Sequence, residues 1–369
     1  MFNGIIVIGT RPEAIKLLPI YLQFRTTKNA RVKILSTGQH KEMVDPLYKF
    51  FDVKPDIKLN VMSPGQTLAH ITASVVARFT EVLSKNRPDF VIVQGDTTSA
   101  MAAGLASFYL KIPVMHVEAG LRSYRMDAPF PEELNRRILS LFSTIHFAPT
   151  RISAAALRAE KLPGKISVVG NTVIDSLMMT RKKVRSNPYP YQRKFNFLKG
   201  FKRMVLITAH RRENHGAGLS KICGAIRSLA TMYQDVAWVY PVHLNPAVQQ
   251  IVYRDLDKLD NVFLIEPVRY DEMIFLMDKS SLIMTDSGGV QEEAPSLNKP
   301  VIVLRSVTER IESIKAGYGV LVGSSPLRII TETRRLLAQD PLKRKFKNPY
   351  GDGKSSVKIV RQILQALKR

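Results

Sequence analysis

Carboxylates and a histidine stand where apolar, strand-like runs end, and these residue types can move protons. Asp96 follows the run DFVIVQ, Glu118 follows PVMHV, and His210 follows MVLITA. A carboxylate between a buried strand and Gly120 is a costly place for an idle charge. A histidine at a strand end can act as a general acid or base, or donate to a phosphate. These residues are candidates for acid–base chemistry, although Asp96, which Thr97 follows, could instead cap a helix.

A second acidic pair lies in PFPEELNRR (129–137). Pro131 suits the first turn of a helix, which brings Glu132 and Glu133 near the positive end of the helix dipole. Compensation of the helix dipole accounts for the presence of only one of these two glutamates. The other is a candidate for a catalytic role.

The segment TDSGGVQEEAPS has the pattern of a phosphate-binding turn. The apolar run SLIMTD ends in Ser287, Gly288 and Gly289, and a helix-like segment follows. Such a turn presents backbone N–H groups at the positive end of a helix, and glycine lets a ligand approach closely. Glu292 and Glu293 come about one turn later, within reach of hydroxyls attached to a bound phosphate. The pattern indicates a nucleotide diphosphate, although many turns of this kind bind nothing.

The segment GTRPEAIK (9–16) brings two cations to the end of the first apolar run. Pro12 fits the first turn of a helix, with Arg11 just before it. Arg11, as a planar fork, and Lys16, as a point charge, are natural partners of a diphosphate. An ordinary helix start with solvated basic residues would have the same sequence.

The composition limits the class of protein. The 369 residues carry 55 Lys and Arg against 31 Asp and Glu, a formal net charge of +24. This excess attracts polyanions, but the basic residues are scattered, and the short runs 182–185 and 343–347 lack the aromatic pattern of a nucleic-acid groove. A basic solvated surface is therefore the favoured interpretation, and we expect no nucleic-acid partner.

The same composition bears on localisation. No apolar run approaches the roughly 20 residues of a membrane helix, and the N-terminus lacks the features of a signal peptide. Cys223 is the single cysteine, which fits a reducing compartment. We therefore predict a cytoplasmic protein without a membrane partner.

Motifs for metals and common cofactors are missing. There is no HExxH or CxxC pattern, and no GxGxxG or Walker sequence, so we expect no metal, no NAD and no P-loop. Asp255 and Asp257 form a DxD, a pattern that some metal-dependent sugar transferases use. It lies in a polar helical stretch (249–260), which favours a solvated helix face.

The apolar runs that position these residues alternate with helical stretches such as 67–83. Two series of runs stand on either side of the polar stretch 181–194: 5–9, 32–37, 89–94 and 113–117, then 204–209, 237–242, 262–267, 281–286 and 300–305. Nearly continuous apolar runs are typical of parallel strands covered on both faces. Two βαβ series predict an α/β protein with two doubly wound Rossmann-like domains.

We expect the N-terminal domain to span 1–170 and the C-terminal domain to span 171–354, with an amphipathic helix at 355–369 packing back on the first. Ligands of open α/β sheets bind beyond the carboxyl ends of the strands. Gln39 and His243 also follow strands. Polar strand ends in both domains predict that the two domains face each other across a charged cleft.

Taken in chain order, these motifs resemble the non-hydrolysing UDP-N-acetylglucosamine 2-epimerases. The resemblance covers nearly the whole chain and rests on ordered matches: GTRPEAIK, TGQHKEM, QGDTTS, HVEAGLRS, PFPEELNR, GNTVIDS, HRREN, YPVHLNP, DSGGVQEEAPSL, TER and NPYGDGKSS. It implies a fold like that of the GT-B glycosyltransferases, a homodimer, and interconversion of UDP-GlcNAc and UDP-ManNAc without metal or NAD, in the service of surface polysaccharide.

The resemblance also implies roles for matching residues. Those for UDP are Arg11, Lys16, Ser287, Gly288, Gly289, Glu293 and Arg310, with Glu293 on the ribose. Those for catalysis are Asp96, Glu118, Glu132 and His210. Members of this family bind a second UDP-GlcNAc as an activator, and the positions implicated in that site are Gln39, Arg211 and His243.

Several positions depart from the family pattern. Asn298 stands where the family usually has glycine, Gly65 where an arginine often reaches the activator, and Ile311 and Ser313 interrupt the sequence after Arg310. Four different functions stay open: a 2-epimerase for a related UDP-2-acetamido sugar, a GT-B glycosyltransferase, a hydrolysing epimerase that releases free ManNAc, and a non-catalytic binder of nucleotide sugars or polyanions.

Overall fold

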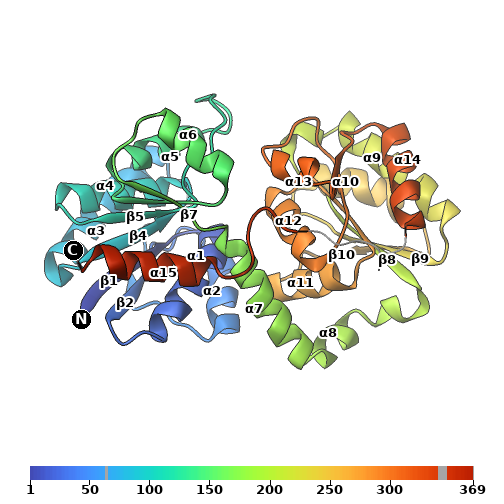
Figure 1. Cartoon of the computed structure of the whole chain (residues 1–369). Coiled ribbons are helices and arrows are strands. Elements are labelled where there is room, and N and C mark those ends of the chain that lie inside the picture. Colours follow the sequence, from blue (N-terminus) through green and yellow to red (C-terminus); the bar gives the residue numbers. More distant parts are fainter. Residues whose placement is uncertain (63–64, 340–346, 369) are drawn as a thin grey trace. The chain divides into compact units, whose positions relative to one another are not determined.

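The computed structural model describes residues 1–62, 65–339 and 347–368, and its contacts divide the chain into two compact units (Figure 1). The first unit comprises Met1–Ser176 with Tyr350–Arg369, and the second comprises Leu177–Pro349. The sequence pattern placed this division after residue 170.

The first unit is built on a parallel sheet in the order β3-β2-β1-β4-β5-β6-β7. Its strands are β1 (Phe2–Ile8), β2 (Ala30–Ser36), β3 (Ile57–Lys58), β4 (Phe90–Gln94), β5 (Val114–Val117), β6 (Ile145–Ala148) and β7 (Lys165–Val168). Its helices are α1 (Arg11–Arg25), α2 (Lys41–Phe51), α3 (Leu68–Asn86), α4 (Thr98–Tyr109), α5 (Glu132–Phe142), α6 (Arg151–Ala159) and α15 (Ser355–Ala366), while α7 (Thr172–Ser186) leads into the second unit.

The second unit has a parallel sheet in the order β10-β9-β8-β11-β12-β13. Its strands are β8 (Arg203–Thr208), β9 (Val236–Pro241), β10 (Val262–Ile265), β11 (Leu282–Thr285), β12 (Val301–Val303) and β13 (Gly319–Leu321). Its helices are α8 (Tyr189–Lys194), α9 (Ala217–Met232), α10 (Pro246–Leu256), α11 (Tyr270–Lys279), α12 (Gly288–Glu293), α13 (Ile311–Lys315) and α14 (Pro326–Ala338), with 3₁₀ turns at Asn196–Gly200, Arg212–Asn214 and Ala294–Leu297.

The strands and helices form where the apolar pattern requires them. Every residue of β4 is buried, as expected for a parallel strand with helices on both faces. Helix α3 buries Ile71, Val75, Phe79 and Leu83, which recur at the spacing of one helix face. The prediction of an α/β fold with two doubly wound units is confirmed.

Each sheet reverses its strand order at one point. The reversal lies between β1 and β4 in the first unit and between β8 and β11 in the second. Crevices at the carboxyl ends of such strand pairs are the usual ligand sites of doubly wound folds. The segments that leave these ends carry Arg11 and Asp96 in the first unit, and His210 and Ser287 in the second. The candidate residues therefore lie where each sheet can bind a ligand.

The C-terminal helix α15 belongs to the first unit and lies against α1 (Figure 1). Asp175 of α7 anchors its start, because the carboxylate accepts from the backbone N–H of Ser355 at 3.1 Å and of Ser356 at 2.7 Å. A buried carboxylate thus satisfies the N–H groups at the start of α15.

Some elements differ from what the sequence indicated. The polar stretch 181–194 is mostly helical, because α7 runs to Ser186 and α8 starts at Tyr189. The strands β3, β6, β7 and β13 were not predicted, since they are short and β7 is not buried in the manner of the central strands. No described helix combines the length and the apolar character of a membrane span.

A glycine substitution tests the turn after β5. Gly120 has φ +91°, and a Cβ there would overlap the Ser153 carbonyl oxygen. We expect Gly120→Ala to lower the free energy of unfolding by about 2 kcal/mol or more, measured by urea denaturation. Gly224 of α9 is the control, because a Cβ at this position would have no atom within 4 Å. Its change to alanine should stabilise the chain by about 0.5–1 kcal/mol, and equal effects of the two variants would contradict the account.

Candidate active site

Glu118 is the most constrained of the predicted acids. It follows β5 with φ +63°, a left-handed conformation that is uncommon for a residue with a side chain, and it is 9% exposed. Its Oε1 accepts from Lys16 Nζ at 2.5 Å and from Asn171 Nδ2 at 2.9 Å, and its Oε2 accepts from Gln94 Nε2. Strained backbone that the surroundings hold in place is typical of functional sites.

Asp96 interacts with this carboxylate through its charge. Thr97, not Asp96, caps α4, because the Thr97 hydroxyl accepts from Ala100 N, so the interpretation of Asp96 as a helix cap is wrong. The Asp96 carboxylate pairs with Arg136. Burial raises the pKa of Asp96, Arg136 opposes this rise, and the nearby charge of Glu118 adds to it. Asp96 is therefore a carboxylate held closer to neutrality than usual.

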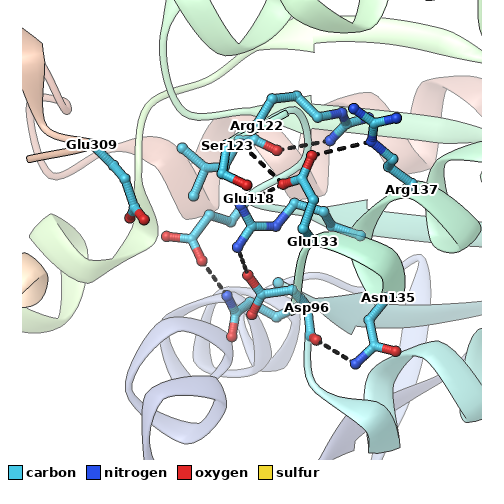
Figure 2. Close-up of polar contacts among 12 residues, drawn as sticks. Asp96, Glu118, Arg122, Ser123, Glu133, Asn135, Arg137 and Glu309 are labelled. Carbon is cyan, nitrogen blue, oxygen red and sulfur yellow. Dashed lines mark hydrogen bonds and ion pairs between the residues drawn. The ribbon is translucent and has the colours of Figure 1, made fainter. Parts of the chain in front are cut away.

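The acidic pair at the start of α5 divides into two roles. Glu133 is structural: it accepts from Ser123 N at 3.0 Å and from Arg137 Nε at 3.1 Å (Figure 2). Glu132 makes no such contacts, and its Oε2 is buried without a hydrogen-bond partner in the described part of the chain. Pro131 is the N-cap rather than a first-turn residue. Glu132 is thus the glutamate with an oxygen left for another group.

The first unit also contains a buried acid, Glu13, which is among the polar residues that follow the first strand and for which the sequence indicated no specific role. Glu13 of α1 is 1% exposed, and burial raises its pKa. Its carboxylate accepts from Gly9 N at 2.7 Å, Thr10 N at 2.6 Å and Thr97 Oγ1 at 2.5 Å. It therefore ties the turn after β1 to the turn after β4. The capping-box spacing after Thr10 was the signal that could have found it.

The remaining predicted residues of the first unit lie at the same strand ends. Arg11 is the first residue of α1 and is half-buried. Gln39 follows β2, and its Oε1 accepts from Ser99 Oγ at 2.7 Å. The structure thus brings Gln39 into contact with the start of α4, the helix that follows Asp96.

His116, which was not predicted as a site residue, contacts the backbone next to Asp96. The ring is fully buried in β5, and its Nε2 lies 2.8 Å from the carbonyl oxygen of Gly95, the residue before Asp96. Burial lowers the pKa of His116 to about 3. A neutral imidazole that donates to this carbonyl fixes the backbone at the end of β4.

In the second unit, Asp286 arranges the loop that carries His210. Asp286 is 0% exposed, and its Oδ2 accepts from the backbone N–H of His210 and of Arg211, both at 2.8 Å. The His210 ring stacks on His243 at 5.2 Å between centroids. Burial lowers the pKa of His210, and the Asp286 charge opposes this shift. The structure therefore brings together His210, Arg211 and His243, for which the sequence implied separate roles.

The glycine turn is built around Arg310. Ser287 is the N-cap of the short helix α12, and a Cβ on Gly288 would lie 2.9 Å from the guanidinium carbon of Arg310. A side chain at Gly288 would therefore displace the Arg310 guanidinium, and the expected close approach of a ligand to this glycine stays a prediction. Gly289 has no atom within 4 Å of such a Cβ, which leaves room beside its backbone.

The two glutamates of α12 hold side chains from other segments. Glu292 accepts from Arg310 Nε at 3.0 Å, and Glu293 accepts from the Tyr270 hydroxyl at 2.7 Å. Both glutamates are buried. Arg310 also pairs with Glu309 at 2.6 Å, so two carboxylates hold its guanidinium beside the glycine turn.

The described residues contain no group of three His, Cys, Asp or Glu side chains that could hold a metal ion. Asp255 of the DxD pairs with Arg254 at 2.8 Å, and this hydrogen bond lowers the pKa of Asp255. Asp257 is the C-cap of α10. The motif thus lies at the end of α10, with Asp257 exposed and the Asp255 side chain only 15% exposed, so a fully solvated helix face holds for Asp257 alone.

Comparison with known proteins identifies the family. Residues 23–364 match the profile of the family UDP-N-acetylglucosamine 2-epimerase. A relative from Neisseria meningitidis, a UDP-N-acetylglucosamine 2-epimerase, is 46% identical over 97% of this chain and 98% of its own. The chain belongs to the UDP-N-acetylglucosamine 2-epimerase family.

Solved structures of epimerases have the same fold. The Neisseria meningitidis UDP-GlcNAc 2-epimerase bound to UDP-GlcNAc matches with a TM-score of 0.91 and 44% identity, covering 98% of this chain and 100% of that one. The Methanocaldococcus jannaschii UDP-GlcNAc 2-epimerase in complex with UDP-GlcNAc and UDP matches with a TM-score of 0.83 and 35% identity, covering 99% and 100%. The predicted GT-B-like fold class is confirmed.

The structure accounts for two departures from the epimerase pattern. Asn298 has φ +58°, and asparagine is the residue that best replaces glycine in this conformation. Ser313 is buried in α13, and its hydroxyl lies 3.4 Å from the carbonyl oxygen of Gln291. Both substitutions therefore fit their places in the epimerase fold. Gly65 has φ +68°, and nothing in the structure explains the loss of an arginine there.

The neutral His116 makes a testable contribution to acid sensitivity. Its pKa is about 3 when folded and near the ordinary 6.5 when unfolded, so between these values only the unfolded chain takes the proton. The free energy of unfolding should therefore fall as pH drops through this window, by roughly 1.4 kcal/mol per pH unit from this residue.

The variant His116→Gln keeps an amide that can donate to the Gly95 carbonyl. Between pH 7 and pH 5, we expect its free energy of unfolding to fall by about 2 kcal/mol less than that of the natural chain. Urea denaturation at the two pH values measures the difference. An identical pH dependence in both chains would contradict a neutral buried His116.

Proposed function

We propose that this epimerase interconverts UDP-N-acetylglucosamine and UDP-N-acetylmannosamine by eliminating UDP to 2-acetamidoglucal and adding it back. The observation that carries the proposal is the placement of Glu118: a buried carboxylate at the carboxyl end of β5, next to β4, paired with Lys16 of α1. The family relationship and the UDP-GlcNAc bound to the Neisseria meningitidis enzyme support the choice of substrate.

The chemistry requires the diphosphate to leave first. The C2 proton of the sugar is not acidic, because no carbonyl group neighbours it. Loosening of the C1–O bond gives C1 oxocarbenium character, which acidifies C2. Cations that stabilise the departing diphosphate contribute several kcal/mol in such reactions. A carboxylate that removes the proton contributes about 10²–10⁴-fold.

The proposed roles follow from the contacts within each unit. In the first unit, Arg11 and Lys16 stabilise the diphosphate. The Lys16 ammonium has three N–H donors, so it can donate to Glu118 and to a phosphate oxygen at the same time. In the second unit, the groups proposed for UDP are Ser287, Gly288, Gly289, Glu293 and Arg310. His210, whose backbone N–H donates to Asp286, is proposed to donate to the phosphate or to act as an acid.

Epimerisation needs proton transfer on both faces of C2, and three carboxylates are available. Glu118 is fixed by its donors and suits the removal of a proton in a defined direction. Asp96, which lies beside Glu118 and pairs with Arg136, is the second candidate, for the return of a proton to the sugar. Glu132 has an oxygen without a partner in the described part of the chain and is the third member of this group.

Deuterium incorporation tests the reaction directly. We expect incubation with UDP-GlcNAc in D₂O to give UDP-ManNAc, with deuterium at C2 of both the product and the recovered substrate. NMR of the reaction mixture measures the label. Release of free ManNAc would indicate a hydrolysing epimerase, and no incorporation would exclude epimerisation of this substrate.

Further outcomes of the deuterium assay would assign a different function. Label at C2 of a UDP-2-acetamido sugar that differs at C3, C4 or C6, at a higher rate than with UDP-GlcNAc, would assign a related substrate. Transfer of the sugar to an added acceptor without C2 label would indicate a GT-B glycosyltransferase. Binding without any turnover would leave a nucleotide-sugar or polyanion-binding protein.

A Glu118→Gln variant separates catalysis from binding. The amide keeps the size of the side chain but cannot remove a proton, so we expect C2 exchange to fall by at least about 100-fold. The Kd for UDP, measured by calorimetry, should stay within a few-fold of the natural value. Glu42→Gln, on the exposed surface of α2, is the matched control and should exchange normally. Unimpaired exchange in Glu118→Gln would remove Glu118 from the mechanism.

Three further parts of the proposal rest on the family relationship. We propose a homodimer, a role in supplying ManNAc-type sugars for surface polysaccharide, and activation by a second UDP-GlcNAc. The residues proposed for the activator are Gln39, Arg211 and His243. The stacking of His243 on His210 supports a connection between activator and catalytic loop.

A further inference from the structure

Asn171 connects the carboxylate of Glu118 to the C-terminal part of the chain. It lies between β7 and α7 and is 3% exposed. Its Nδ2 donates to Glu118 Oε1 at 2.9 Å, and its Oδ1 accepts from Val173 N at 3.1 Å. One end of the amide therefore caps the start of α7 while the other end reaches the acid.

The backbone of Asn171 is fixed by the returning C-terminal segment. Its N–H donates to the carbonyl oxygen of Tyr350 at 2.6 Å. The preceding Gly170 has φ +93°, and a Cβ there would lie 3.2 Å from the same oxygen and 3.3 Å from the Gly351 Cα. The two segments are thus packed so closely that a side chain at residue 170 would require the backbone of residues 350 and 351 to shift.

A second contact holds this segment in place. Asp175, one turn into α7, accepts from the N–H groups of Ser355 and Ser356. Asp175 is 2% exposed, so the anchor is buried. Asn171 is therefore held from two sides: by the start of α7 and by residues 350–356 of the C-terminal return.

We propose that Asn171 is a positioning residue for Glu118, and that the C-terminal return sets its position. The amide acts through Glu118: it holds Oε1 in one place and stabilises the ionised form by donating to it. The role in catalysis rests on the proposed function of Glu118, whereas the effect on the Glu118 carboxylate does not.

The other groups that face Glu118 set the background for a test. Lys16 of α1 donates to the same oxygen, and Gln94 of β4 donates to the other. Asp96, after β4, and His116, in β5, interact with Glu118 through their charges. A change at Asn171 alters none of these four side chains, so a shift in the titration of Glu118 that the control variant lacks can be assigned to the lost amide.

The test compares Asn171→Ser and Asn171→Asp with the natural chain. Both side chains can still accept from Val173 N and cap α7, but serine is too short to donate to Glu118, and aspartate places a negative charge against it. The titration midpoint of Glu118 is measured by NMR on chains with ¹³C-labelled glutamate carboxyl groups, with the signal assigned by its loss in Glu118→Gln. Exchange at C2 of UDP-GlcNAc is measured against pH on the same samples.

We expect the Glu118 midpoint to move to higher pH in Asn171→Ser and further in Asn171→Asp. The acid limb of the exchange profile should move with it, and kcat near neutral pH should fall roughly ten- to a hundredfold. Asn261→Ser is the matched control, because its buried amide donates to three carbonyls, of Ala230, Tyr233 and Val236. The Asn261→Ser variant should lower Tm without moving the Glu118 titration midpoint or the acid limb of the exchange profile.

Two outcomes would overturn the inference: an unchanged Glu118 midpoint in both variants, or an equal shift in Asn261→Ser. A shifted midpoint in a chain that shows no C2 exchange at all would refute the proposed function and support the link between Asn171 and Glu118. If the aspartate variant does not fold, the serine variant alone decides.

Discussion

The buried ion pair between Lys16 and Glu118 is the interaction around which the first unit is arranged. A carboxylate that is 9% exposed is costly unless donors surround it, and an ion pair alone seldom repays the loss of hydration. Donors therefore come from α1, β4 and the segment before α7, which fixes the positions of those elements at one end of the sheet. The same requirement holds Glu118 in a left-handed conformation that few residues adopt.

A related device appears in both units. In each, a buried acid accepts backbone N–H groups from the turn after the first strand at the point where strand order reverses: Glu13 in the first unit and Asp286 in the second. Glu13 also reaches Thr97 beyond β4, while Asp286 itself follows β11. Each acid thus joins the two strand ends between which a doubly wound sheet binds ligands. Rigid turns at these ends suit the preorganised site that the proposed reaction requires.

Much of this could be predicted from the sequence because the signals are local. Continuous apolar runs identified the central strands, and the residues that follow these strands include the candidates Asp96, Glu118 and His210. The supporting residues could not be found in the same way, because their partners are distant: Asn171 is 53 positions from Glu118, and Asp286 is 76 from His210. The choice between Glu132 and Glu133 also required side-chain contacts, since adjacent acids have the same pattern.

In the proposed mechanism, the C1–O bond to UDP breaks before Glu118 removes the C2 proton, because only then is this proton acidic. UDP-GlcNAc with ¹⁸O in the bridge between C1 and the β-phosphorus tests this most directly. We predict that the enzyme moves the label into the non-bridging oxygens of the β-phosphate while deuterium enters C2, as followed by ³¹P NMR. Deuterium at C2 with the ¹⁸O retained in the bridge, even after substrate and product have reached equilibrium, would contradict the account.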